Sequence, residues 1–179
     1  MHPVTVGDPR AAFAGVCTTG LCAEMHEIWE AALVLRVEDR EQIHTWQLPI
    51  NLERTDAAVL KLGCFSDRRV PDHELAGLSE FADALTDLTV GTHLVCVRAE
   101  FTGEFLRRLL HRHGRVEGWR HLVDAESLAA GRLAAPPPWD LREMSPSLGV
   151  DVSQLATDTA LGRALWAKAV YDATVGVRV

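Results

Sequence analysis

Cysteine and histidine are the side chains of this sequence that could carry nucleophilic or zinc chemistry. Cys17 follows a short apolar run and His26 is the nearest histidine, so a thiol activated by an imidazole is one hypothesis. Burial of Cys17 as a small apolar strand residue is the interpretation that the pattern favours. His111 and His113 lie at the end of an expected helix. This position favours an interaction with the helix dipole as their role, and not metal binding. None of the four cysteines forms a C-x-x-C pair, so the sequence does not predict a zinc site.

The composition is that of an ordinary globular chain. With 179 residues, of which 47% are hydrophobic and 24% charged, it predicts one α/β domain over residues 1–179. No apolar run approaches the roughly 18 residues of a membrane span and no signal sequence begins the chain, so we expect a cytoplasmic protein. The formal charge of −7 argues mildly against a protein that coats nucleic acid, but it does not exclude a local groove that binds phosphate.

Alternating strands and helices must position any site. Nearly continuous or alternating apolar runs predict strands, and apolar residues at helical spacing predict helices. A proline-rich connector at residues 134–139 separates two helical stretches, and Leu141, Met144 and Leu148 after it are again at helical spacing. The expected strands are 13–18, 28–37, 43–48, 92–97 and 121–123, and the other expected helices are 78–88, 104–113, 126–133 and 159–173. The order β-β-β-α-β-α-β-α-α-α predicts a mixed five-stranded sheet flanked by helices on both faces.

Three separated segments of the chain carry a family resemblance. Residues 14–21 read A-G-V-C-T-T-G-L and residues 26–33 read H-E-I-W-E-A-A-L, which resembles the D-x-E-T-T-G-L and H-E-I-x-E-I-A strands of DnaQ-like 3′–5′ exonucleases. Residues 94–102, L-V-C-V-R-A-E-F-T, are similar to that family's L-V-x-H-N-x-x-F-D. Residues 158–164, D-T-A-L-G-R-A, are similar to its H-x-A-L-x-D-A. The three segments follow one another in the family's order, so the chain resembles the DEDDh branch of these exonucleases, which have an RNase H-like fold.

The resemblance implies a two-metal active site, and the chain departs from it at every position. Family members cleave phosphodiesters from a 3′ end with two divalent ions held by four carboxylates, and a histidine assists the attacking water. Carboxylates are needed because Mg²⁺ takes oxygen ligands and two such ions repel each other. The corresponding residues here are Gly15, Cys17, Thr102, Asp158 and Arg163. Their charges sum to zero where the family has four negative charges, so we expect no metal and no catalytic residue here.

The missing carboxylates leave two alternatives open. A slipped alignment is disfavoured by the T-T-G-L segment, and no Asp or Glu lies between Arg10 and Cys22. Replacement by other acids would leave an active exonuclease with displaced ligands that still uses Mg or Mn. The acids that lie near the motifs in sequence are Glu24, Glu27, Glu30, Glu100, Asp124 and Asp158.

The preferred interpretation is therefore a pseudoenzyme without a cofactor. One hypothesis is a protein-interaction or assembly role within a larger complex of phage or host-defence origin, which the acidic charge slightly favours. The other is a module that keeps the old groove for a single-stranded nucleic-acid end. Its expected contacts are Thr18, Thr19, Leu21, Arg98 and Arg163.

Two geometric expectations follow from the resemblance. The five departed positions should converge at one end of the sheet, because three motifs match in order. Asp158 and Arg163, which carry opposite charges, should interact, directly or through one water, and fill part of the vacated site.

Overall fold

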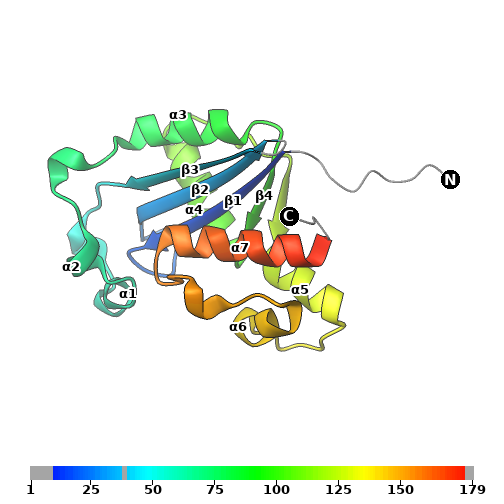
Figure 1. The fold of residues 1–179 in the computed structure, drawn as a ribbon. Coiled ribbons are helices and arrows are strands. Elements are labelled where there is room, and N and C mark those ends of the chain that lie inside the picture. The colour runs from blue at the N-terminus through cyan, green and yellow to red at the C-terminus, as the bar shows by residue number, and fades with distance from the viewer. Residues whose placement is uncertain (1–9, 38–39, 176–179) are drawn as a thin grey trace.

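The computed structural model describes residues 10–37 and 40–175, which form one five-stranded sheet with helices on both faces (Figure 1). The strands lie in the order β3-β2-β1-β4-β5. The meander of β1, β2 and β3 is antiparallel, whereas β4 pairs with β1, and β5 with β4, in parallel. The strands are β1 (Arg10–Thr18), β2 (Ile28–Val37), β3 (Arg40–Gln47), β4 (His93–Cys96) and β5 (His121–Asp124). The predicted mixed sheet is thus confirmed.

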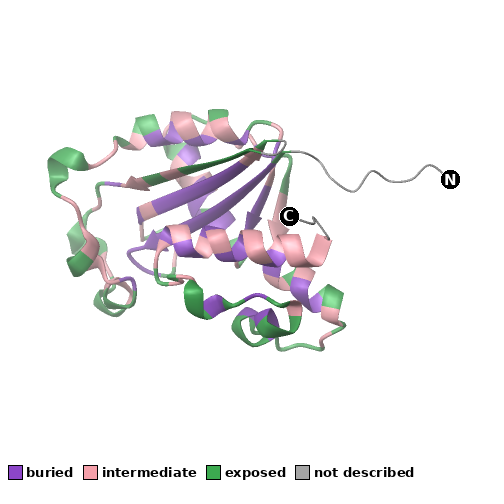
Figure 2. Ribbon diagram, viewed as in Figure 1, coloured by how far each residue is buried: buried purple, intermediate pink, exposed green. Residues whose placement is uncertain are grey.

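The burial of each strand follows its place in the sheet. β1 and β2 are buried almost throughout, as the continuous apolar runs of their sequences require of central strands (Figure 2). β3 is an edge strand and is mostly exposed, with charged and polar side chains in its first half.

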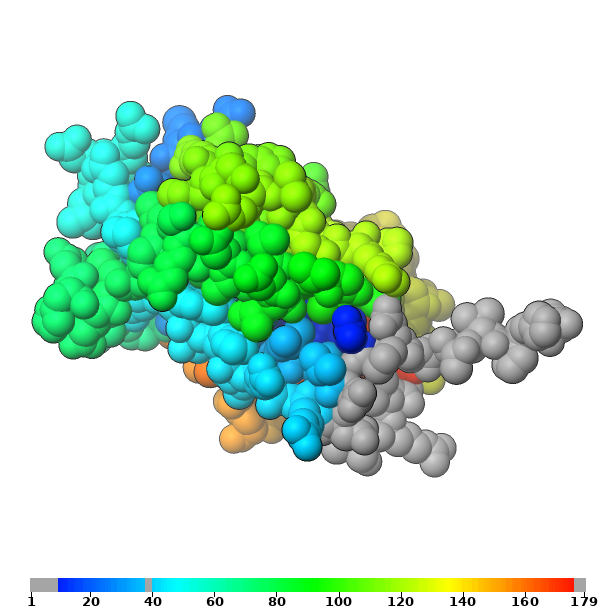
Figure 3. Space-filling model, turned by 90° about the horizontal axis from the view of Figure 1, so that it is seen from above, coloured from blue at the N-terminus to red at the C-terminus, as the bar shows by residue number. Residues whose placement is uncertain are grey.

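Helices cover each face of the sheet and create two hydrophobic cores. α7 packs on β1 and β2, and with α5 and α6 it encloses a core around Phe13, Trp29 and Trp166. On the other face α3 and α4 enclose a second core around Phe81 and Phe105. Seen from above, α3 lies beside the segment that follows α4 (Figure 3), and Arg115 of that segment forms an ion pair with Asp83 of α3. The helices are α3 (Leu78–Thr89), α4 (Ala99–Arg112), α5 (Ala125–Leu133), α6 (Leu141–Met144) and α7 (Ala160–Val175).

The structure corrects the expected element list at two places. Two short helices, α1 (Ala57–Leu62) and α2 (Phe65–Arg68), lie between β3 and α3, where the sequence predicted none. α4 begins at Ala99, five residues before the expected start at residue 104, because its first turn already packs Ala99 and Thr102 against the sheet. Within the described ranges, no helix combines the length and the apolar character needed to cross a membrane.

Candidate functional site

A pocket of about 380 Å³ opens where β1 and β4 end. Its floor is the end of β1, and its walls come from the first turns of α4 and α7, from α6 and from the α1–α2 segment. Figure 1 shows α7 beginning at this end of β1. In α/β sheets, ligands bind outside the carboxyl ends of parallel strands, so the position is the expected one for a site. The lining residues are Ala14, Gly15, Cys17, Thr18, Leu21, Trp29, Val59, Leu62, Gly63, Val97, Arg98, Phe101, Thr102, Arg142, Thr157, Arg163 and Trp166.

The five positions that depart from the exonuclease pattern come together at this pocket. Gly15, Cys17, Thr102 and Arg163 line it directly. Asp158 is the neighbour of a lining residue, and its backbone carbonyl accepts a hydrogen bond from the Cys17 thiol at 3.3 Å. Residues up to 148 positions apart in the chain, from Gly15 to Arg163, thus meet where the resemblance expects them.

Gly15 lies directly under the first turn of α7. A Cβ atom at this position would be 2.9 Å from the backbone nitrogen of Ala164 and from the Cβ of Arg163, and nearer still to the carbonyl oxygen of Ala160. Ordinary Cβ contacts lie at 3.4–4 Å. The absence of a side chain at Gly15 is therefore a condition for the close packing of α7 on β1.

Arg163 binds backbone carbonyl groups. Its Nη1 donates to the carbonyl of Val16 at 2.6 Å and its Nε donates to the carbonyl of Thr157 at 3.0 Å. The expected direct pair with Asp158 is wrong: between these two described residues no ion pair is formed, and Asp158 is exposed. The reason is that carbonyl groups of β1 and of the loop before α7 lie within reach of the guanidinium. Arg163 thus ties α7 to the end of β1.

Cys17 is a neutral, buried thiol. Burial, partly offset by Arg163 and Arg68 and reinforced by Glu30, raises its pKa to about 12. A thiol with this pKa is protonated at neutral pH and is a poor nucleophile. His26 hydrogen-bonds the backbone of its own loop instead, at Cys22. The hypothesis of a Cys17–His26 nucleophile is therefore not supported by the geometry.

Glu30 is the carboxylate nearest to Cys17, and it is fully engaged. Both of its oxygens accept hydrogen bonds from the guanidinium of Arg68, at 3.0 and 2.9 Å. One oxygen also accepts the backbone N–H of Ala160 at 2.9 Å, at the N-terminus of α7. The Arg68 guanidinium lies over the Trp29 ring, 4.9 Å from its centroid. The pair is mostly shielded from solvent, and Arg68 neutralises the charge of Glu30.

The other acids near the motifs serve local structure. Glu27 accepts the N–H of Asn51 at 2.7 Å, and Asp124 caps the N-terminus of α5 through the N–H groups of Glu126 and Ser127. Glu24 lies on the loop after β1, 3.7 Å from Arg108. Glu100 lines a neighbouring hollow beside the first turn of α4 together with Glu104, Asp124 and Glu126, and this hollow shares Arg98 and Phe101 with the pocket.

The donors at the pocket do not fit a pair of magnesium ions. Mg²⁺ requires oxygen ligands with near-octahedral geometry, and these positions offer a glycine, a neutral thiol, a threonine hydroxyl and a guanidinium. The guanidinium of Arg163 would repel a cation. Across residues 10–37 and 40–175, no group of three or more His, Cys, Asp or Glu side chains is arranged to hold a metal ion.

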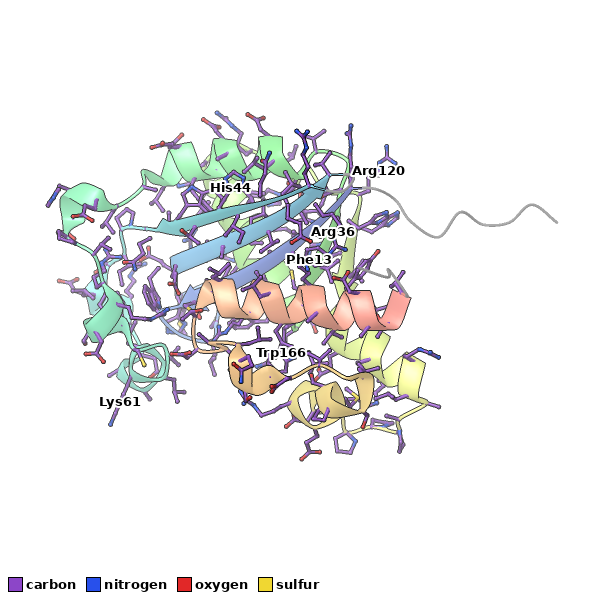
Figure 4. All side chains as sticks on the ribbon, in the orientation of Figure 1. Phe13, Arg36, His44, Lys61, Arg120 and Trp166 are labelled. Atoms are coloured by element: carbon purple, nitrogen blue, oxygen red, sulfur yellow. The ribbon has the colours of Figure 1, made fainter. Side chains whose placement is uncertain are left out.

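The charged residues that line the pocket are all arginines. Arg98, Arg142 and Arg163 line it, and the lining residues that the structure describes include neither Asp nor Glu. Arg142 comes from α6; it donates to the Thr157 hydroxyl at 2.8 Å and lies over the Trp166 ring, which Figure 4 labels beneath α7. Arg142 was not predicted from the sequence, because nothing in the polar segment after the proline-rich connector indicates that it returns to the sheet edge.

The remaining expected contacts separate into two groups. Leu21 and Thr18 line the pocket, with 70% of Leu21 exposed, and Arg98 stands at the N-terminus of α4. Thr19 does not line it. Its side chain is fully buried and its hydroxyl accepts the N–H of Glu27 at 2.9 Å, so Thr19 holds the loop and is removed from the candidate contacts.

Comparisons with known proteins find the same fold at low sequence identity. No protein-family model matches the sequence, and no curated protein matches it. Among solved structures, E. coli exonuclease I in complex with a dA16 oligonucleotide superposes with a TM-score of 0.71 at 13% identity, over 96% of this chain and 41% of that chain. A product-bound exonuclease I superposes with a TM-score of 0.68 at 13% identity, over 92% of this chain and 44% of that chain. The zinc-bound E. coli enzyme with single-stranded DNA superposes with a TM-score of 0.66 at 14% identity, over 94% of this chain and 40% of that chain.

The chain therefore spans about two fifths of the length of these exonuclease structures. At such identity the likeness shows the fold alone, which is the RNase H-like α/β fold of the exonuclease I structures. The predicted fold class is confirmed.

Proposed function

We propose that this protein binds the 3′ end of a single-stranded nucleic acid in the arginine-lined pocket and does not cleave it. The observation that carries the proposal is the pocket lining, which combines three guanidinium groups with no carboxylate among the residues that the structure describes. The pocket lies at the carboxyl ends of β1 and β4, where the resemblance expects a 3′ end. The structures with the same fold include exonuclease I bound to single-stranded oligonucleotides.

Arginine suits this ligand because its planar guanidinium binds phosphate oxygens through paired hydrogen bonds. Each guanidinium has five N–H groups, of which Arg163 uses two for the carbonyl groups of Val16 and Thr157, and Arg142 uses one for the Thr157 hydroxyl. Donors thus remain for a phosphate at the pocket. In the metal-dependent family, cations must screen the phosphate from carboxylates, whereas here the side chains themselves carry the positive charge.

The other side of the pocket is apolar and accommodates a base and a sugar. Leu21 and Leu62, 70% and 75% exposed, stand at the mouth, and Phe101 contributes an aromatic face. Exposed leucines are costly in water, and a nucleobase that covers them removes apolar surface from solvent. A volume of about 380 Å³ lies in the range of pockets that hold small ligands.

The donor set is the reason to propose binding without cleavage. Two metal ions would need several carboxylates at the centre, whereas no Asp or Glu lines the pocket among the residues that the structure describes, and Glu30, Glu27 and Asp124 are held by Arg68, by loop backbone and by a helix cap. The acidic net charge of −7 is the observation that favours an assembly role with a protein partner. We give the pocket more weight, because function resides in a site and the local charge of this site is opposite to that of the whole chain.

The test is equilibrium binding of fluorescent single strands that differ in their ends. A linear oligonucleotide with a free 3′ end should bind tighter than a circular strand of the same sequence. Arg142→Gln should weaken binding about tenfold to a hundredfold, the value of one hydrogen bond to a charged group at about 1.5–3 kcal/mol. Arg142 is a suitable probe because its one hydrogen bond, to Thr157, is at the surface.

The matched control is Arg120→Gln, which makes the same charge change at the opposite edge of the sheet (Figure 4). Affinity should stay within about twofold of wild type, since an exposed charge remote from the ligand contributes little. Equal binding of linear and circular strands, or equal effects of the two substitutions, would refute end binding in this pocket.

A further inference from the structure

A second hollow lies along α4, beyond the pocket. It has a volume of about 160 Å³ and lies between the loop after β1 and the outer side of α4. We call it the α4 hollow; its lining residues are Ala23, His26, Glu27, Ile28, Pro49, Leu78, Phe105, Arg108, Leu109, Arg112 and His113. Beside it, an open depression shares Arg108 and Arg112 and adds Arg107, His111 and one acid, Glu104.

The charge of the α4 hollow is positive. Arg108 and Arg112 line it together with two histidines, whereas Glu27 is its one acidic lining residue among those the structure describes. Glu27 is engaged by the N–H of Asn51. The acid that faces the arginines is Glu24, 72% exposed, at 3.7 Å from Arg108.

Arg108 also has an unused donor. Its Nε atom is buried and has no hydrogen-bond partner in the part of the chain that the structure describes. A buried donor without a partner costs free energy, so a movement of the Arg108 side chain that brought this N–H to an acceptor oxygen of a ligand would be favourable. A phosphate group offers such oxygens and a negative charge.

The α4 hollow and the arginine-lined pocket are lined by neighbouring residues of the same two elements. The loop after β1 lines the pocket through Leu21 and the α4 hollow through Ala23. On α4, Phe101 lines the pocket and Phe105, one turn later, lines the hollow, with their ring centroids 4.8 Å apart. Both cavities thus lie on one seam between this loop and α4.

The length of the seam matches a short single strand. From Phe101 to Arg112 the helix rises about 16 Å, at about 1.5 Å per residue. Stacked nucleotides advance about 3.4 Å each, so about five of them cover this distance, and fewer if the strand is extended.

We infer that the α4 hollow binds backbone phosphates of the same strand, a few nucleotides on the 5′ side of the end held in the pocket. The inference rests on the proposed function and adds a second subsite made of different residues. Arg108 and Arg112 hold phosphate there by charge and hydrogen bonding, without contact to the bases. The affinity therefore depends on the length of the strand and not on its sequence.

The test is a length series of single strands with free 3′ ends, from two to about ten nucleotides, measured against wild type and three variants. Wild-type affinity should rise until the strand covers the seam and then level off. Arg112→Gln should lower the affinity for long strands about fivefold. It should also reduce the slope of log K against log salt by about 0.7, the value for one phosphate. It should leave the dinucleotide unchanged.

Glu24→Gln provides a variant with the opposite sign. Removing the carboxylate that competes for Arg108 should raise the affinity for long strands about twofold and leave the affinity for the dinucleotide unchanged. Arg120→Gln is the control for charge alone. Neither Arg112 nor Glu24 belongs to a core, so both variants should fold.

The outcomes separate the two proposals. If the dinucleotide binds in an Arg142-dependent manner but affinity does not depend on length or on Arg112, the α4 hollow is not a subsite and the pocket proposal stands. If long strands bind through Arg112 and do not depend on Arg142, the pocket proposal fails and the hollow alone binds the strand. If no strand binds, both are overturned.

Discussion

Addition of one methyl group at Gly15 tests how the vacated site is built. In the Gly15→Ala variant the new Cβ would lie 2.9 Å from the Ala164 nitrogen, at least 0.5 Å inside the ordinary contact distance of 3.4 Å, and nearer still to the Ala160 carbonyl oxygen. Both are backbone atoms of α7. No rotamer change can relieve the overlap, so β1 and the first turn of α7 must separate.

The cost of this separation has two parts. Overpacking of a core contact costs about 1–3 kcal/mol. Displacement of the α7 N-terminus also weakens the hydrogen bond from the Ala160 N–H to Glu30, now 2.9 Å long, and a bond to a charged group is worth about 1.5–3 kcal/mol. We expect a loss of about 3–5 kcal/mol, a large part of the roughly 5–15 kcal/mol that stabilises a domain.

Reversible urea unfolding, followed by circular dichroism, measures the effect. Gly131→Ala is the matched control, because Gly131 lies in α5 and no described atom lies within 4 Å of the methyl group that alanine would add there. Alanine should stabilise that helix by about 0.5 kcal/mol. A Gly15→Ala protein as stable as wild type would refute the close packing of α7 on β1. It would also refute the view that α7 fills the space above Gly15.

Three further predictions concern the residues around Cys17. Arg163→Ala should lower the free energy of unfolding by about 2 kcal/mol, because two backbone carbonyl groups lose a charged donor, and urea unfolding checks this; Arg163→Asp alone should not produce 3′-end cleavage in Mg²⁺ or Mn²⁺. Arg68→Ala should cost about 3 kcal/mol in the same assay by leaving Glu30 without its partner, and a loss below about 0.5 kcal/mol would contradict this. Burial raises the pKa of both the Cys17 and Cys96 thiols from 9.0 to about 12. The stability that the neutral thiols contribute is therefore complete below pH 9 and is lost as the pH rises towards 12, so stability should fall less steeply in this range for the double alanine variant than for wild type.

The strands and long helices could be predicted because their patterns are strong. β1 and β2 are continuous apolar runs, and α3 presents Phe81, Ala82 and Leu85 on one buried face. The α1–α2 segment could not be predicted, since helices of six and four residues contain too few turns for a hydrophobic period to appear. That segment nevertheless builds one wall of the pocket and supplies Arg68.

At the site, the positions could be predicted and the contacts could not. The motifs located Gly15, Cys17, Thr102 and Arg163, which meet at one pocket. The direction of each side chain depends on tertiary packing: Arg163 reaches the carbonyl of Val16, 147 residues away, and not the nearby Asp158. Thr19 was misassigned for the same reason, because the sequence does not show which of two adjacent buried threonines lines the pocket.

Gly15 and Arg163 together hold α7 against the end of β1. Gly15 admits α7 against β1, and Arg163 then ties that helix to the strand end with a hydrogen bond of 2.6 Å. Both contacts occupy positions at which the exonuclease pattern has carboxylates. Compared with that pattern, the two residues offer no metal ligand, and Arg163 places a fixed cation at the pocket.

The central claim is that the pocket binds a 3′ end without metal and without cleavage. The most direct measurement is the affinity for one 5′-labelled single strand with a free 3′ end, in excess EDTA and again in Mn²⁺, with the length of the recovered strand determined after each. We predict that the affinity is the same within about twofold in the two conditions, because the arginines and not metal ions meet the phosphate, and that the strand is recovered at full length. Binding that requires Mn²⁺, or shortening of the strand from its 3′ end, would contradict the account.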